Sequence, residues 1–205
     1  MNTISSEQED FRNLICKDII DSIEHGVYVS NLARYMGKEL QLSDEECYNL
    51  ALAGLLHDIG KLRLSTYLYG DEDTSDVTRL RYVRTHSKIS YDILDERGFD
   101  DKIKNIILYH HENYDGSGYP FNLRGEEIPY GARILRVRDV FIALISDRSY
   151  RKAFDKKTAV ELMIDEVKNF DMQIFLAFLN VINSIDVDEE IRRIHIDKKE
   201  IKELF

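Results

Sequence analysis

The stretch that decides the fold of this chain is residues 43–58, which reads SDEECYNLALAGLLHD. Ser43 followed three residues later by Glu46 forms a capping box, the pattern that opens a helix by satisfying its first backbone N–H groups. The apolar run Leu50–Leu56 continues this helix and is too short to cross a bilayer. The run ends in His57-Asp58. Burying an imidazole beside a carboxylate is costly unless something satisfies both, and a divalent metal ion does so.

Helical patterns extend outward from this stretch in both directions. Apolar residues recur at three- and four-residue steps, and polar or glycine residues mark the helix ends. The predicted helices span residues 5 or 6 to about 40, 43 through 56, 75 or 76 to before 98, about 100 through 108, 132–146, 157–169 and 173–183. The polar run Gly70–Ser75 is predicted to be a loop. So is Tyr114–Gly131, an ordered loop or lid that holds four of the ten glycines and both prolines.

Composition supports an all-α fold with a single core. The chain has 205 residues, of which 43% are apolar and 32% charged, a balance typical of globular proteins. This length suffices for one sizeable core and a short appendage, but not for two full domains. We therefore predict a helical bundle domain over residues 1–184. Residues 185–205, which are charged with alternating isoleucines, form a short C-terminal appendage, either a hairpin or a helix.

The net charge of −10 argues against binding to a nucleic acid polymer or to an anionic membrane surface, because both require a basic patch. It does not exclude an anionic ligand, since a multivalent metal centre reverses the local field. Cys16 and Cys47 are isolated thiols without a CxxC spacing, which fits a reducing compartment. Residues 1–11 are polar and acidic and show no signal peptide. The expected location is the cytoplasm, without membrane insertion.

Five of the six histidines fall at predicted helical positions or helix ends: His25, His57, His86, His110 and His111. Asp139 is likewise embedded in an otherwise apolar helix. A lone histidine on a helix is more often a hydrogen-bonded core or surface residue than a ligand. That explanation does not comfortably cover a His-Asp pair, a His-His pair and an embedded aspartate in one short chain. Neighbours on a helix point about 100° apart, so the tandem pair suits two adjacent ions or a helix-end site.

Two segments carry a resemblance to a known family. They are His57-Asp58-Ile59-Gly60-Lys61 and His110-His111-Glu112-Asn113-Tyr114-Asp115-Gly116-Ser117-Gly118-Tyr119-Pro120. Together they resemble the HD-GYP branch of the HD hydrolase superfamily, and the similarity runs from about Asp21 to Leu179. HDxxK alone is moderately specific, but HHE and DGxGYP following it in order make a strong signal.

This resemblance implies an HD-domain helical bundle that holds two, sometimes three, iron or manganese ions and hydrolyses cyclic di-GMP to linear pGpG and then GMP. By motif, one metal ion is held by His25, His57, Asp58 and Asp139. The neighbouring ion is held by His86, His110 and His111, with Asp58 bridging the two sites. Asp21, one turn before His25, stands where some three-metal members of the family place a carboxylate. It is equally an exposed acidic residue that needs no special role.

The chemistry makes sense of these residues. Two metal ions about 3.5–4 Å apart can bind a bridging hydroxide near neutral pH and neutralise the charge that develops on the phosphoryl oxygens. Asp58 and Lys61 are the residues predicted to be catalytic. Lys61, one turn beyond Asp58, can reach the phosphate as a point charge. Its alternative role is that of a solvated cation at a helix end.

Other residues are predicted to contact the substrate. Arg148 and Arg151 resemble the phosphate- or guanine-contacting arginines of the family, although surface pairing with a nearby aspartate explains them almost as well. Gly118 provides the backbone freedom of a tight lid, and Tyr119 offers a face on which a base can stack. A loop that only braces the helices is the alternative for both.

Two departures from the family pattern bear on the site. Leu64-Ser65-Thr66 and the acidic loop 70–76 replace the usual Ile-Pro-Asp motif, and Ile142 replaces an aspartate that would be a partner for Lys61. Two alternatives stay open, and these departures keep the second of them, a binding module, in consideration. The chain could be an HD hydrolase for another nucleotide, such as cyclic GMP-AMP. Otherwise it could be a cyclic-dinucleotide-binding module that acts through signalling partner proteins. A homodimer is compatible with each reading.

Overall fold

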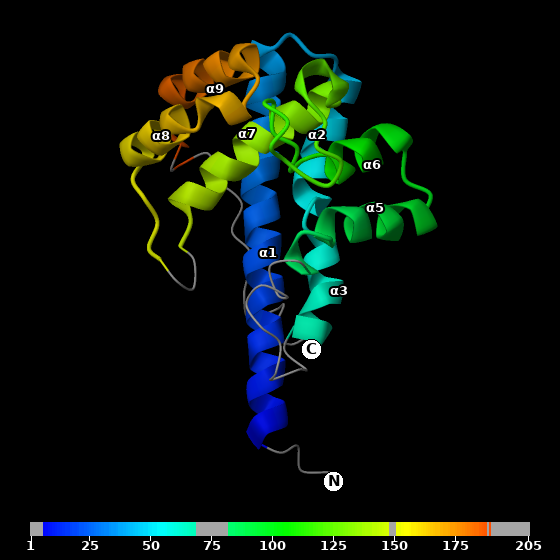
Figure 1. Cartoon of the computed structure of the whole chain (residues 1–205). Coiled ribbons are helices and arrows are strands. Elements are labelled where there is room, and N and C mark those ends of the chain that lie inside the picture. The colour runs from blue at the N-terminus through cyan, green and yellow to red at the C-terminus, as the bar shows by residue number, and fades with distance from the viewer. Residues whose placement is uncertain (1–5, 69–81, 148–150, 188, 190–205) are drawn as a thin grey trace.

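The computed structural model describes residues 6–68, 82–147, 151–187 and 189, and no strand element occurs among them. The predicted all-α fold is confirmed (Figure 1). The helices are, in chain order, α1 (Ser6–Glu39), α2 (Asp44–Leu56), α3 (Ile59–Leu68), α5 (His86–Glu96), α6 (Asp101–Leu108), η1 (Gly125–Glu127), α7 (Tyr130–Ile145), α8 (Lys156–Asp165), η2 (Val167–Asn169) and α9 (Met172–Ser184). No described helix is both long and apolar enough to cross a membrane.

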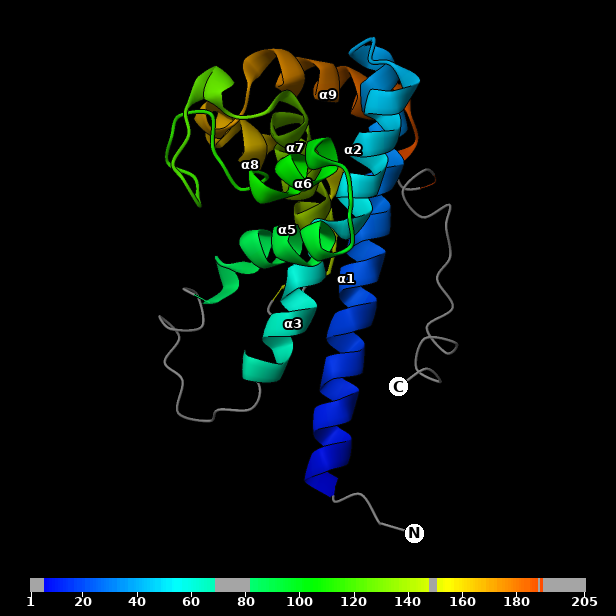
Figure 2. The same ribbon diagram turned by 90° about the vertical axis from the view of Figure 1, so that its right-hand side faces the viewer.

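Helix α1 is the spine of the bundle, and α2 runs beside it in both views (Figures 1 and 2). The predicted capping box opens α2 as expected. Ser43 Oγ accepts from Glu46 N at 3.3 Å, and Ser43 N donates to a Glu46 carboxylate oxygen at 2.9 Å. The N-terminal half of α1 extends beyond the other described helices, while its C-terminal half packs into the core.

A break between α2 and α3 creates the turn that carries His57 and Asp58. The sequence analysis did not predict α3 as a separate helix. The Ser90 hydroxyl of α5 stabilises this break. It donates to His57 O at 2.8 Å and accepts from Gly60 N at 2.9 Å. A Cβ on Gly60 would collide with the carbonyl oxygen of His86 and with Ser90, so only glycine lets α5 approach this closely.

The helix expected to run from about residue 75 to before Gly98 is interrupted in the structure. Its expected start and the loop at 70–75 lie outside the described residues. Residues 82–83 are helical, residues 84–85 form a turn, and α5 begins anew at His86. The interruption puts His86 at the first turn of α5 instead of in the middle of a helix.

The core forms where α7 and α9 pack against α1, α2 and α6, as the two views show (Figures 1 and 2). Phe141 and Phe178 meet edge to face there, with ring centroids 5.0 Å apart. Arg138 is also fully buried in α7. Its guanidinium donates to Val29 O and Leu50 O, both at 3.1 Å, and so ties α7 to α1 and α2.

The C-terminal helices differ from the expectation in one place. The helix predicted over 157–169 ends as an α-helix at Asp165 and is followed by the short 3-10 helix η2. α7 and α9 match their predicted ranges to within two residues. The segment 114–131 is largely loop, as predicted, and contains η1. Most of the predicted appendage, 190–205, lies outside the described residues, and the domain boundary at 184 stays a prediction.

Candidate metal centre

Seven side chains that are far apart in the sequence converge at one place in the bundle. They come from α1, the α2–α3 turn, the first turn of α5, the turn after α6, and α7. Their donor atoms form three overlapping groups, each with its atoms within 4.8 Å of one another: His25, His57 and Asp58; His57, His110 and Asp139; and His86, His110 and His111. These are the seven residues that the sequence analysis assigned to metal.

Asp58 lies between the histidines of the two predicted metal sites. Its Oδ2 is 3.4 Å from His57 Nε2, and its Oδ1 is 3.2 Å from His86 Nε2. Asp139 Oδ1 lies 3.5 Å from the same Nε2 atom of His57 and 2.9 Å from His25 Nε2. The two oxygens of the Asp58 carboxylate therefore face different halves of the cluster. A bridging ligand requires this arrangement.

Three of the histidines are oriented in the same way. The Nδ1 atoms of His57 and His110 lie 2.8 and 2.6 Å from backbone carbonyl oxygens three residues earlier, and His86 Nδ1 makes the corresponding bond to Val83 O. A carbonyl can only accept, so each Nδ1 carries the proton. In the neutral imidazole, Nε2 is then left with its lone pair, aimed at the cluster. Fixing the tautomer through the outer nitrogen is typical of metal-ligating histidine.

The centre also contains buried donor atoms that the described residues leave unsatisfied. His57 Nε2 and Asp58 Oδ1 are buried and form no hydrogen bond with any residue in the described ranges. Such atoms are costly in a protein interior unless an ion or water completes them. The donor spacings of 2.9–3.5 Å match the edges of a coordination shell, because ligand atoms about 2.1 Å from one ion are about 3.0–3.4 Å apart. The residues therefore fit divalent metal ions.

The electrostatics of the centre favour positive charge. Burial opposes ionisation of Asp58, but His57 and Lys61 outweigh it and hold the pKa of this carboxyl well below its usual range. Burial likewise opposes a charge on His57, yet the carboxylates of Asp58 and Asp139 raise its pKa to about 10. The two carboxylates thus create a buried field that stabilises a cation, whether a proton or a metal ion.

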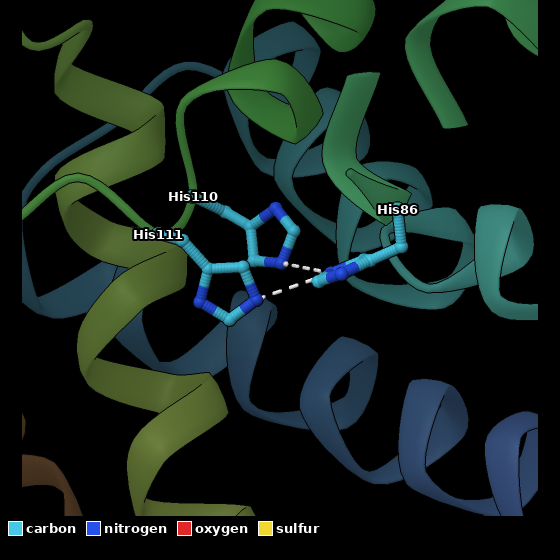
Figure 3. A group of neighbouring side chains, drawn as sticks. All are labelled: His86, His110 and His111. Atoms are coloured by element: carbon cyan, nitrogen blue, oxygen red, sulfur yellow. Dashed lines mark hydrogen bonds between the residues drawn. The ribbon is translucent and has the colours of Figure 1, made fainter. Parts of the chain in front are cut away.

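His110 and His111 lie in the turn that follows α6, as expected for a helix-end site, and both point at His86 of α5 (Figure 3). His86 Nε2 is 3.4 Å from His110 Nε2 and 3.1 Å from His111 Nε2. Burial and the neighbouring imidazoles hold the pKa of both His110 and His111 well below the usual value. These histidines are therefore neutral, which is the state that binds metal.

Lys61 stands at the edge of the centre. Its Nζ donates to Asp58 Oδ2 at 2.7 Å, and its side chain is 38% exposed whereas that of Asp58 is 7% exposed. The ammonium group thus has one side on the buried carboxylate and the other toward solvent. Ile142 stands where the family usually has an aspartate that would be a partner for Lys61. Its side chain is fully buried in the hydrophobic core.

The loop after the histidine pair folds back onto it. The buried carboxylate of Glu112 accepts hydrogen bonds from Phe121 N at 2.7 Å and Leu123 N at 3.1 Å. Gly118 is buried, and a Cβ there would collide with the backbone of residues 111–113. Tyr119 stacks on the ring of His111, with centroids 4.7 Å apart, so this loop forms one wall of the centre.

The remaining predicted site residues lie apart from the cluster or outside the described residues. Asp21 is exposed and belongs to none of the three donor groups found among the described residues. Arg148 lies outside the described residues. The Arg151 guanidinium donates to Leu144 O at 2.9 Å and to Lys152 O at 3.0 Å, and it also bonds Ala143 O at the C-terminal end of α7. These bonds engage Arg151 with the helix end, where a cation is favourable.

Sequence reasoning missed two residues that organise the centre. Ser90 was not singled out, because a serine within a helix does not by itself indicate a function. Its two hydrogen bonds to the α2–α3 break exist only because α5 packs against that break. Glu112 was quoted as part of a motif without a role. The position of Glu112 directly after the histidine pair could have indicated a role at the site. The spacing of residues could not have shown that Glu112 anchors the loop.

The curated relatives of this chain are phosphodiesterases. The chain is 34% identical over 169 residues to the cyclic di-GMP phosphodiesterase PA4108 of Pseudomonas aeruginosa, covering 82% of this chain and 41% of that protein. It is 39% identical over 136 residues to the response regulator RpfG, a cyclic di-GMP phosphodiesterase of Xanthomonas campestris, covering 64% and 35%. It is 31% identical to a 3'3'-cGAMP-specific phosphodiesterase of Vibrio cholerae, covering 78% and 35%. The chain thus spans less than half the length of these relatives.

Solved structures agree on the fold. Bd1817, an HDG"Y"P protein of Bdellovibrio bacteriovorus, aligns with a TM-score of 0.63 at 24% identity, covering 79% of this chain and 52% of that one. The cyclic GMP-AMP phosphodiesterase V-cGAP3 of V. cholerae aligns with a TM-score of 0.65 at 17% identity, covering 86% and 48%. The HD domain family matches residues 1–174, which include all seven converging side chains. On this match, and with the predicted fold in place, the chain belongs to the HD domain family.

Proposed function

We propose that this protein is a metal-dependent phosphodiesterase that hydrolyses cyclic di-GMP to linear pGpG, GMP or both. The observation that carries the proposal is the position of Asp58, whose two oxygens face histidines of different donor groups. That arrangement suits a pair of ions acting on one phosphodiester. The names of the relatives support the substrate class, because they are phosphodiesterases for cyclic di-GMP or for 3'3'-cGAMP.

The donor set supports two divalent ions, with iron or manganese as the expected metals. The donor set consists of five imidazole nitrogens and two carboxylates. Iron, manganese and other first-row ions all accept nitrogen and oxygen donors of this kind, so the availability of each metal decides among them. When bound, such a pair lowers the pKa of coordinated water and neutralises charge on the phosphoryl group. Asp21 as a ligand of a third ion remains a prediction with no support from its exposed position.

The chain's own residues have separable roles in the proposed reaction. His57 and Asp139 supply donor atoms that lie 3.5 Å apart, and Asp58 joins the two halves of the cluster. Together with His57, Lys61 holds the pKa of the Asp58 carboxyl low, and it presents its exposed side to an incoming phosphate. The wall that contains Gly118 and Tyr119 limits the site on the side of the histidine pair.

Substrate contacts by Tyr119, Gly118, Arg148 and Arg151 remain part of the proposal. One face of Tyr119 is covered by His111, and the guanidinium of Arg84 lies 5.4 Å from the ring centroid. A base would therefore stack on Tyr119 only after Arg84 moved. Arg84 is exposed and is able to do so. A reducing, cytoplasmic setting completes the proposal and fits the free thiol of Cys47.

The test is incubation of the purified protein, loaded with Mn²⁺ or Fe²⁺ under anaerobic conditions, with cyclic di-GMP and, in parallel, with 3'3'-cGAMP. Formation of pGpG or GMP that is lost in Asp58→Asn supports the proposal. Turnover of 3'3'-cGAMP alone would replace the proposed substrate by another of the same class. Tight binding of cyclic di-GMP without product from either nucleotide would show a binding module and refute the proposed activity.

A further inference from the structure

Arg136 of α7 stands against the centre but has no role in the metal cluster. It lies one helical turn before Asp139. Its Nε donates to Asn113 Oδ1 at 3.0 Å, and its Nη1 lies 3.5 Å from His111 Nδ1. Figure 3 shows α7, in yellow-green, passing beside His111. The contact places a guanidinium directly behind one of the histidines that face His86.

The charge of Arg136 is not neutralised by an ion pair with any carboxylate in the described parts of the chain. Arg133, one turn earlier on the same helix, shows the contrast, because its Nη1 bonds Asp171 Oδ2 at 2.6 Å. Burial lowers the pKa of Arg136, an effect that the nearby Asp139 opposes, but an arginine stays charged at neutral pH. A partly buried cation is thus kept beside the centre without an anionic partner.

Most of the donor capacity of this guanidinium is unused. A guanidinium carries five N–H donors, and the only one that Arg136 donates to a clear acceptor among the described residues is the Nε–H, while Nη1 lies 3.5 Å from the His111 ring nitrogen. Its Nη2 makes no hydrogen bond to the described residues. The planar fork of N–H groups matches two oxygens of one phosphate better than it matches any neutral group.

The charged side chains around the centre are unevenly distributed. The carboxylates of Asp58 and Asp139 lie toward α1 and α3, whereas Arg136 and the exposed Arg84 border the wall formed by His111 and Tyr119. An anionic ligand bound at the metal cluster is attracted by Arg136 and Arg84 at this wall, as it is by Lys61 at the edge beside Asp58. A phosphodiester is such a ligand.

We propose that Arg136 is a substrate-binding residue that donates to a non-bridging phosphate oxygen of the cyclic dinucleotide, next to His111. This inference rests on the proposed function for the identity of the substrate, although the binding of phosphate by Arg136 does not depend on turnover. The competing explanation is that Arg136 only braces the loop through Asn113. The two explanations differ in which variants weaken phosphate binding.

The experiment compares the metal-loaded wild type with Arg136→Gln, Arg136→Lys and Asn113→Ala. Arg97→Gln is the matched control, because it removes the same charge from the exposed far end of α5. Calorimetry measures the Kd for inorganic phosphate. Steady-state kinetics separate KM from kcat for cyclic di-GMP and for bis(p-nitrophenyl) phosphate, a diester with a single phosphate. Metal content and circular dichroism are recorded for every variant.

We expect Arg136→Gln to raise the phosphate Kd and the KM for both diesters about 10-fold or more, the usual effect of losing a charged hydrogen bond. Arg136→Lys should restore part of the loss, whereas Arg97→Gln should match the wild type. A rise for cyclic di-GMP alone would place Arg136 on the second phosphate. If Arg136→Gln matches the wild type in phosphate Kd and KM, or if Asn113→Ala reproduces its full effect, the proposal is overturned.

These outcomes separate the two proposals. If the wild type fails to hydrolyse cyclic di-GMP but its phosphate Kd still depends on Arg136, the proposed function fails and the role of Arg136 stands. If the wild type turns over cyclic di-GMP and Arg136→Gln changes nothing, only the role of Arg136 fails. Should Arg136→Gln not fold, Arg136→Lys carries the test, because a lysine lacks the planar fork and should bind phosphate more weakly than the wild type.

Discussion

Asp58 Oδ1 lies 3.2 Å from His86 Nε2, although the two residues belong to helical segments separated by α3 and the turn before α5. The contact joins the half of the cluster built on α1 and α2 to the half built on α5 and the turn after α6. It exists because the α2–α3 break and the first turn of α5 are pressed together at Gly60.

Metal binding should stabilise the fold. A ligand that binds only the native state adds about 2.7 kcal/mol at 100 times its Kd, so chelation by EDTA should lower Tm and added Mn²⁺ should restore it. Asp58→Asn keeps the size of the side chain but removes its charge, and should abolish most of the Mn²⁺-dependent rise in Tm. Differential scanning fluorimetry with metal analysis measures both. A full Mn²⁺ response in Asp58→Asn would show that Asp58 is not a ligand.

Ser90→Ala should destabilise the protein by about 1–3 kcal/mol, because it leaves Gly60 N buried without its acceptor and His57 O without its donor. The variant should also bind metal more weakly, since the turn that carries Asp58 loses its support. Urea denaturation measures the stability, and the midpoint should fall without a change in slope.

Ser87→Ala is the matched control for Ser90→Ala. Ser87 lies on the same helix and is equally buried, but its hydroxyl has no hydrogen-bond partner among the residues that the structure describes. Removing an unsatisfied buried hydroxyl should leave stability unchanged or raise it slightly. Equal losses in the two variants would mean that the loss of a buried hydroxyl, rather than the junction at Gly60, is responsible.

Glu112→Ala should loosen the loop without removing metal ligands. The side chain accepts two backbone hydrogen bonds, from Phe121 N and Leu123 N, and a charged acceptor makes each stronger than a neutral one. We expect faster proteolysis within residues 114–131 and an unfolding free energy lower by about 1–3 kcal/mol. Metal content should stay close to that of the wild type. Unchanged cleavage of this segment would show that other contacts hold the loop.

Arg138→Met should be tolerated, whereas Arg138→Ala should not. Burial lowers the pKa of Arg138 to about 9, which means that the interior disfavours its charge, and its two bonds go to backbone carbonyls rather than to a carboxylate. Methionine removes the charge and fills most of the volume, so stability should be equal or higher. Alanine leaves a cavity and should cost about 2–5 kcal/mol. Thermal unfolding of both variants decides the matter, and a strong loss in Arg138→Met would show that the buried charge is required.

The sequence predicted the helical fold from its own pattern, and it predicted the residues that converge at the centre through its resemblance to the HD-GYP branch. The capping box at Ser43 and the apolar periodicity are local signals, and local backbone geometry satisfies them directly. The His57-Asp58 and His110-His111 pairs were recognisable because imidazoles and carboxylates in apolar surroundings need a partner.

Only the tertiary structure decided how those residues meet. The break after Leu56 and the new start of α5 at His86 depend on a hydroxyl and a glycine from different helices, and no periodicity reports such contacts. The position of Arg136 behind His111 has the same origin. Helix propensity acts between near neighbours in the chain, whereas a metal centre is assembled by packing between distant segments, and packing is specified by the whole core at once.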